Sequence, residues 1–201
     1  METINNWKSI NELFDRKEIE NKIKDLLINF DNYSKSINFK KGIYIYGSPG
    51  SGKTHFINKI LKELDFDIIS YDAGDIRNKS LIDTITSNNI SSHNVLDMLN
   101  KKKKRIAIIM DEIDGMNNGD KGGIGSLIKV IRQKKTKKQK LENVSLNPII
   151  CIGNKFSDKK IKELMKVCNI FELKLPNNDH ILYCTSIQFQ PVFLIFTQHF
   201  N

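Results

Sequence analysis

A glycine-rich segment between an apolar run and a helical pattern is the feature that most limits the folds open to this chain. The apolar run spans residues 43–46, and apolar residues at helical spacing begin at Phe56. Between them the sequence reads G-x-x-x-x-G-K-T, the spacing of a phosphate-binding loop that joins a strand to a helix. The eight residues of this predicted phosphate loop are Gly47, Ser48, Pro49, Gly50, Ser51, Gly52, Lys53 and Thr54.

The phosphate loop is expected to bind a polyphosphate such as that of ATP. Glycine has no side chain that would keep phosphate away from the backbone. We therefore predict that the amides of residues 50–54 point inward at the start of the helix, where the helix dipole adds positive charge. Lys53 would contact the β- and γ-phosphates, and the Thr54 hydroxyl would hold Mg²⁺. A glycine-rich turn without a ligand is the alternative. The four fixed residues of the motif, the strand pattern before it and the helix pattern after it all argue against this alternative.

A second set of candidate residues follows the apolar run 105–110. This run is continuous and of strand length, as in a strand buried on both faces of a parallel sheet. Asp111, Glu112 and Asp114 follow it, at the strand end where open α/β sheets bind ligands. We predict that Asp111 completes the Mg²⁺ shell and that Glu112 polarises the attacking water. The alternative is that these acidic residues only cap the next helix. The presence of a phosphate loop in the same chain makes this alternative less favoured.

The overall pattern predicts an α/β fold with a parallel, doubly wound sheet, because strands alternate with helices from Ile43 to Leu175. Asn154 follows the apolar run 148–152. There it could hold the water or the γ-phosphate beside the acids, although taken alone it is more typical of a turn. Further strands are predicted at 66–71 and around 170–175, and further helices after Gly123 and over a segment that includes Ile161, Leu164, Met165 and Cys168.

An N-terminal helix is predicted from Asp15. Residues 15–18 fit a capping box. The apolar residues that fall on one face of this helix are Ile19, Ile23, Leu26, Leu27 and Phe30. We therefore expect the helix to pack against the core.

The positive charge is concentrated in one stretch. Residues 101–140 contain thirteen Lys and Arg against four acids, which accounts for the whole formal net charge of +9. Such a region favours a polyanion partner such as nucleic acid over a merely solvated surface. The odd number of cysteines, three, at no metal-like spacing indicates reduced core thiols in a cytosolic or nuclear protein. The polar N-terminus fits neither a secretory nor a transit peptide, and no apolar run is long enough for a membrane span.

These motifs together resemble AAA+ ATPases. The phosphate loop, the pair Asp111 and Glu112, and Asn154 look like Walker A, Walker B and sensor 1. A closer resemblance is to the large subunit of the clamp loader replication factor C. It rests on residues 110–116, 120–124 and 148–151 with Asn154, and the segment 75–79 agrees with it. The resemblance covers roughly Trp7 to Pro176.

The resemblance implies a P-loop AAA+ core with a five-stranded parallel sheet and helices on both faces. We expect an N-terminal helical segment at 1–40, the ATPase core at 41–176, and an atypical apolar tail at 177–201 that could be the start of a truncated lid. The lid and collar domains are expected to be absent, and 133–147 looks like an insertion. Lys166, Val167 and Cys168 replace the Ser-Arg-Cys motif of the small subunits, which favours a subunit that receives the arginine finger.

The implied function is ATP hydrolysis, with partner subunits needed for turnover, to load a sliding clamp onto primer-template DNA. The implied partners are clamp-loader small subunits, the clamp and DNA, without a membrane, in the nucleus or at a viral replication site if the source is a large DNA virus. The DNA would contact Lys129, Arg132, Lys134 and Lys135. A DNA-binding scaffold subunit with little hydrolysis, and a fragment without assembled function, are the alternatives.

Overall fold

The computed structural model describes residues 16–33, 39–72, 105–117, 123–132, 147–154 and 158–175. Five parallel strands form one sheet in the order β2-β3-β4-β1-β5. The strands are β1 (Gly42–Tyr46), β2 (Phe66–Tyr71), β3 (Arg105–Met110), β4 (Ile149–Gly153) and β5 (Cys168–Glu172). The helices are α2 (Lys17–Ile28), α3 (Phe30–Tyr33), α4 (Lys53–Glu63), α7 (Gly123–Ile131) and α9 (Lys159–Val167), with a 3-10 turn, η2, at Ile113–Asn117.

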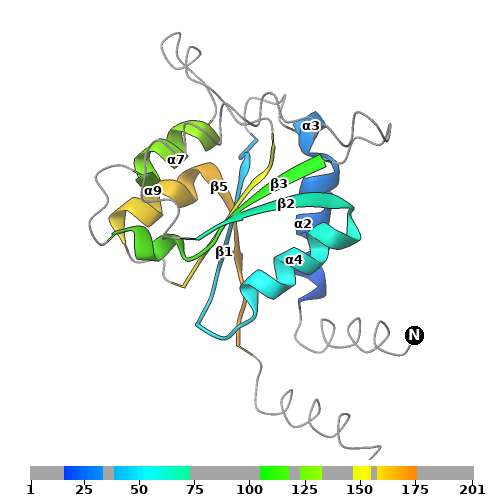
Figure 1. The fold of residues 1–201 in the computed structure, drawn as a ribbon, viewed down its shortest axis with the longest axis horizontal. Coiled ribbons are helices and arrows are strands. Elements are labelled where there is room, and N and C mark those ends of the chain that lie inside the picture. Colours follow the sequence, from blue (N-terminus) through cyan, green and yellow to red (C-terminus); the bar gives the residue numbers. More distant parts are fainter. Residues whose placement is uncertain are drawn as a thin grey trace, which may run out of the picture.

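Helices cover both faces of the sheet, with α2, α3 and α4 on one side and α7 and α9 on the other (Figure 1). Successive side chains of a strand point to opposite faces. Ile43 and Ile45 of β1 accordingly belong to the core that α2 and α4 complete, whereas Tyr44 belongs to the core with α7 and α9. Burial on both faces explains why the inner strands β1, β3 and β4 are mostly continuous apolar runs rather than alternating ones. The edge strands β2 and β5 contain polar residues and are only partly buried. The predicted five-stranded parallel sheet is therefore confirmed.

The register of the sheet brings three strand ends to one edge. Tyr46, the last residue of β1, pairs with Gly153 at the end of β4, and Met110 at the end of β3 pairs with Cys151 of β4. The phosphate loop, Asp111 and Asn154 follow these three ends. Sheet order thus brings together segments that are far apart in the chain.

The junction of α9 and β5 differs from the prediction. Cys168 was expected to continue the helix, but α9 ends at Val167 and Cys168 is the first residue of β5. The apolar residues of helix and strand follow each other without a connecting loop, so periodicity alone could not separate them. Cys151 and Cys168 are buried free thiols, as expected; Cys184 lies outside the described residues.

The start of α2 also differs in detail. Arg16 is the residue before the first helical turn and forms no side-chain cap, while Asp15, the expected cap, lies outside the described residues. The tail at 177–201 and most of the expected insertion at 133–147 are likewise outside them. Within the described segments no helix is long and apolar enough to cross a membrane.

Gly42 should not tolerate a side chain. A Cβ built there would lie 2.4 Å from Cys168 Sγ and 2.8 Å from Ile131 Cγ2, whereas one on Gly125 in α7 would meet no atom within 4 Å. We expect Gly42→Ala to lower the free energy of unfolding by about 1–3 kcal/mol through overpacking. The control Gly125→Ala should raise it by about 0.5–1 kcal/mol, because alanine is a better helix former. Urea unfolding of both variants measures this difference, and equal stability of the two would contradict the packing at β1.

Candidate functional site

The phosphate loop joins the end of β1 to the first residue of α4, Lys53. Gly52 precedes the helix with φ +78° and Gly50 has φ +79°, a left-handed conformation that glycine adopts without steric cost. These two glycines therefore shape the turn. One expectation is wrong: the Ser51 amide donates to the Ser48 carbonyl at 3.2 Å. It closes the turn within the loop instead of pointing toward a ligand.

Lys53 is the centre of the site. Its side chain is buried, and its Nζ donates to the carbonyls of Gly47 and Ser48 at 3.0 Å each and to Asn154 Oδ1 at 2.8 Å. Burial lowers the pKa of Lys53, and the negative charges of Asp111 and Asp114 partly oppose this effect. The predicted lysine and the predicted amide thus meet directly, across 101 residues of chain.

Thr54 and Asp111 form the second contact of the site. Thr54 Oγ1 lies 2.7 Å from Asp111 Oδ2, and Asp111 Oδ1 accepts a hydrogen bond from the Glu112 amide at 2.9 Å. Glu112 is exposed and has φ +51°. A left-handed conformation is unfavourable for a residue with a side chain and tends to occur at functional sites. The two residues predicted to hold Mg²⁺ are therefore adjacent, and Glu112 projects from a strained turn beside them.

Asp114 is a site residue whose own role the sequence did not reveal. From η2 its Oδ1 accepts the backbone amide of Asn154 at 3.2 Å, so it holds the residue that contacts Lys53. A Cβ on Gly153 would lie 2.6 Å from the Tyr44 hydroxyl and 3.1 Å from Asp114 Oδ1, which leaves no room for a side chain there. Burial, with a smaller contribution from the Asp114 charge, raises the pKa of Tyr44 and keeps its hydroxyl neutral.

The predicted DNA-binding residues lie away from this cluster. Lys129 is exposed in the last turn of α7, and Arg132 is half-buried just beyond it. A helix that connects two parallel strands runs back toward their amino ends, so the end of α7 lies away from the edge that carries Lys53. Lys134 and Lys135 lie outside the described residues. The neighbouring helix α9 contributes four exposed lysines: Lys159, Lys160, Lys162 and Lys166.

Comparison with known proteins relates the sequence to a known family. Residues 43–175 match the ATPase family associated with various cellular activities (AAA). The chain is 31% identical over 177 residues to replication factor C subunit 1 of Saccharomyces cerevisiae, covering 80% of this chain and 19% of that protein. It is 32% identical over 154 residues to the replication factor C large subunit of Methanococcus aeolicus, covering 76% and 29%.

A third relative, the replication factor C large subunit of Nanoarchaeum equitans, is 27% identical over 179 residues, covering 87% of this chain and 36% of that protein. The chain thus spans between a fifth and about a third of the length of these relatives. The family match covers every strand of the sheet except Gly42, the first residue of β1, and it ends in the segment after β5. The family match over residues 43–175 shows that the chain belongs to the AAA ATPase family, and the five-stranded parallel sheet agrees with it.

Proposed function

We propose that this chain is the ATP-binding and ATP-hydrolysing domain of a clamp-loader subunit of the replication factor C large-subunit type. The observation that carries the proposal is the meeting of four side chains at one edge of the sheet. Lys53 Nζ lies 2.8 Å from Asn154 Oδ1, and Thr54 Oγ1 lies 2.7 Å from Asp111 Oδ2. The similarity to replication factor C large subunits over most of the chain supports the type of subunit.

Lys53 is suited to bind the β- and γ-phosphates of ATP. Its ammonium is already oriented by two loop carbonyls and Asn154. Anionic phosphate oxygens form stronger hydrogen bonds with an ammonium than neutral carbonyls do. Polyphosphate can therefore displace the internal contacts of Lys53 without leaving the buried charge unpaired.

The residues near Thr54 suit Mg²⁺. A hydroxyl and a carboxylate are hard oxygen donors of the kind that this ion prefers, and Thr54 and Asp111 present one of each at the loop edge. Mg²⁺ held there would neutralise charge on the phosphate oxygens. Thr54 and Asp111 are the ligands that we assign to it.

Glu112 and Asn154 are assigned to the attacking water. The Glu112 carboxylate is exposed at the end of β3, where it would accept a proton from water. The Asn154 side chain, fixed through Lys53 and through its own amide on Asp114, would hold either that water or the γ-phosphate. The arginine that completes the site would come from a neighbouring small subunit.

The first prediction from the proposed function concerns nucleotide binding. Lys53→Ala removes the ammonium that contacts phosphate, so it should weaken ATP·Mg²⁺ binding by roughly 100-fold, since charge-assisted hydrogen bonds contribute about 1.5–3 kcal/mol each. Isothermal titration calorimetry on the folded variant measures the affinity. Lys62→Ala, which removes an exposed lysine of the same helix, is the matched control and should bind as the wild type does. Unchanged affinity in Lys53→Ala would refute the phosphate site.

The second prediction separates binding from hydrolysis. Glu112→Gln keeps the shape of the side chain but removes its basic oxygen, so nucleotide binding should persist while turnover falls by about 100-fold or more. Phosphate release must be measured in a complex reconstituted with clamp-loader small subunits. Glu63→Gln, at the end of α4, is the control and should keep full turnover. If Glu112→Gln also kept full turnover, Glu112 would be a structural residue and not the one that polarises the attacking water.

We further propose that DNA is bound through its phosphates by α7 and the basic stretch around it. The support is the local excess of positive charge and the exposure of Lys129. Phosphate contacts carry no base information, so binding should not depend on sequence. The partners would be small subunits, a sliding clamp and primer-template DNA, and the site of action would be where DNA is replicated, the nucleus in a eukaryotic cell.

The third prediction tests this surface. Replacing Lys129 and Arg132 with glutamine should lower duplex affinity and flatten the log–log salt slope by roughly 0.9 for each phosphate that the protein no longer neutralises. Fluorescence anisotropy titrations over a range of salt concentrations measure both quantities. The control neutralises Lys22 and Lys62, which are exposed on α2 and α4 across the sheet. A basic stretch that is only solvated would give the same slope in both variants.

A further inference from the structure

Arg16, at the start of α2, lies against the phosphate loop. The residue is only 6% exposed, and its Nη2 donates to the carbonyl oxygens of Ser51 and Lys174 at 2.9 Å each. Ser51 belongs to the loop and Lys174 follows β5, 158 residues from Arg16. One guanidinium therefore joins the N-terminal helix, the phosphate loop and the chain that leaves the last strand.

We propose that Arg16 is a positioning residue for the phosphate loop, which holds the Ser51–Gly52 peptide in the orientation that binds polyphosphate. This inference rests on the proposed ATP site. The Ser51 carbonyl and the Gly52 amide belong to one planar trans peptide, so they point in opposite directions; the described chain has no cis peptide. A carbonyl drawn toward Arg16 therefore directs the Gly52 amide away from Arg16, into the loop.

The loop needs such an external bond because of its own glycine. Gly52 has φ +78°, but glycine accepts positive and negative φ about equally, so its local sequence does not select one orientation of the preceding peptide. The neighbouring Ser51 amide is already used within the turn, on the Ser48 carbonyl. The Gly52 amide is thus a donor whose direction depends on what the Ser51 carbonyl contacts.

An arginine suits this position on chemical grounds. The guanidinium stays charged even when burial lowers its pKa, as it does for Arg16. A Cβ on Gly52 would lie 3.9 Å from Arg16 Nη1, so the charge lies against the loop backbone. It therefore adds positive potential next to the expected phosphates. Lysine would keep the charge, but its side chain is shorter by about one bond and could not keep both carbonyl contacts.

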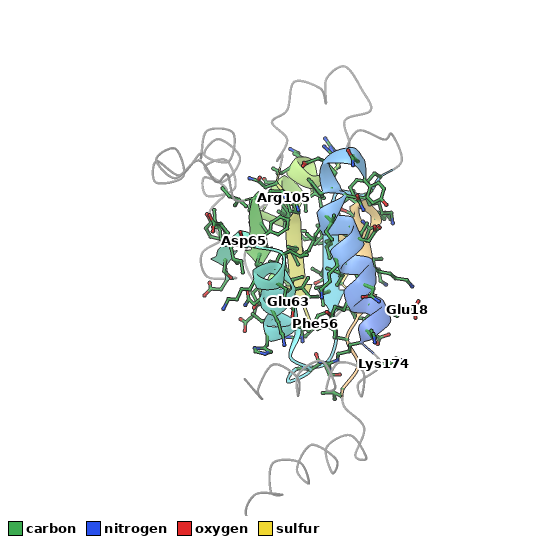
Figure 2. The ribbon with its side chains drawn as sticks, turned by 90° about the vertical axis from the view of Figure 1, so that its right-hand side faces the viewer. Glu18, Phe56, Glu63, Asp65, Arg105 and Lys174 are labelled. Atoms are coloured by element: carbon green, nitrogen blue, oxygen red, sulfur yellow. The ribbon has the colours of Figure 1, made fainter. Side chains whose placement is uncertain are left out.

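Arg105 is a matched control within the same chain. Its Nη1 donates to the carbonyls of Leu27 and Ile28 at 3.2 and 3.1 Å, at the opposite end of α2. In Figure 2 Arg105 and Lys174 are labelled at opposite ends of the sheet. Replacing Arg105 should therefore loosen the other end of α2 without touching the phosphate loop.

The test measures binding of ATP·Mg²⁺ and of inorganic tripolyphosphate to the 201-residue chain by calorimetry, at a temperature where circular dichroism shows every variant folded. Arg16→Met should weaken both ligands by roughly tenfold, because methionine cannot form the charged hydrogen bond that orders the loop. Arg16→Lys should weaken both by about threefold, and Arg105→Met should stay within about twofold of the wild type even where its melting temperature falls.

The outcomes separate this inference from the proposed function. If Arg16→Met binds tripolyphosphate as the wild type does while Lys53→Ala does not bind it, Arg16 only anchors α2 and the inference is wrong. If Lys53→Ala also binds normally, the ATP site itself fails. Where Arg16→Met does not fold, Arg16→Lys decides: affinity reduced by about threefold or more supports the positioning role, and wild-type affinity overturns it.

Discussion

A buried ammonium group needs hydrogen-bond acceptors, and the site is arranged around this requirement of Lys53. The ammonium has three N–H donors, and three close oxygens accept them: the carbonyls of Gly47 and Ser48 and the amide oxygen of Asn154. Removing such a charge from water without partners would cost several kcal/mol in real proteins. The contacts of Lys53 therefore hold the loop, β1 and β4 in fixed relation before any ligand binds.

The same arrangement would make the proposed binding of polyphosphate an exchange of partners. Polyphosphate would have to replace neutral oxygens that already satisfy Lys53, so the gain would be the difference between an ion pair and a charge–dipole contact rather than the whole interaction. The backbone amide of Asn154 donates to Asp114, and this contact does not involve Lys53. The Asn154 side chain could therefore turn to a phosphate or a water while its backbone at the end of β4 stays in place.

Sheet order explains which contacts the sequence could predict and which it could not. The strands at 66–71 and 105–110 were predicted with the bounds that the structure has. For β3 the reason is burial of most of the strand on both faces, which makes it a continuous apolar run, whereas β2 lies at the edge of the sheet, contains polar residues and is only partly buried. The phosphate loop, Asp111 and Asn154 were predicted to lie together because carboxyl ends of parallel strands share one edge. Their direct contacts agree with that expectation.

The features that local sequence patterns could not predict depend on packing between distant segments. The sequence around Arg16 predicts the start of a helix, but it does not predict the contacts of Arg16 with Ser51 and Lys174. Cys168 fits the helical spacing of α9, yet pairing with Gly42 of β1 draws it into the sheet, because tertiary contacts override local propensity at such junctions.

The helix α2 shows how closely the N-terminal segment is joined to the ATPase core, although the family match begins only at residue 43. Ile23 and Leu27 are fully buried in the core that β1 and α4 complete. Arg16 binds the phosphate loop at one end of the helix, and Arg105 of β3 binds its last carbonyls at the other. Between these ends Lys24 forms ion pairs with Glu20 and with Glu63 of α4. Water still reaches these side chains, which are partly buried in Lys24 and Glu20 and exposed in Glu63, and ion pairs screened by solvent stabilise a fold only slightly. The buried leucine and isoleucine therefore hold α2 on the sheet, and the two arginines determine its position along the sheet relative to the phosphate loop.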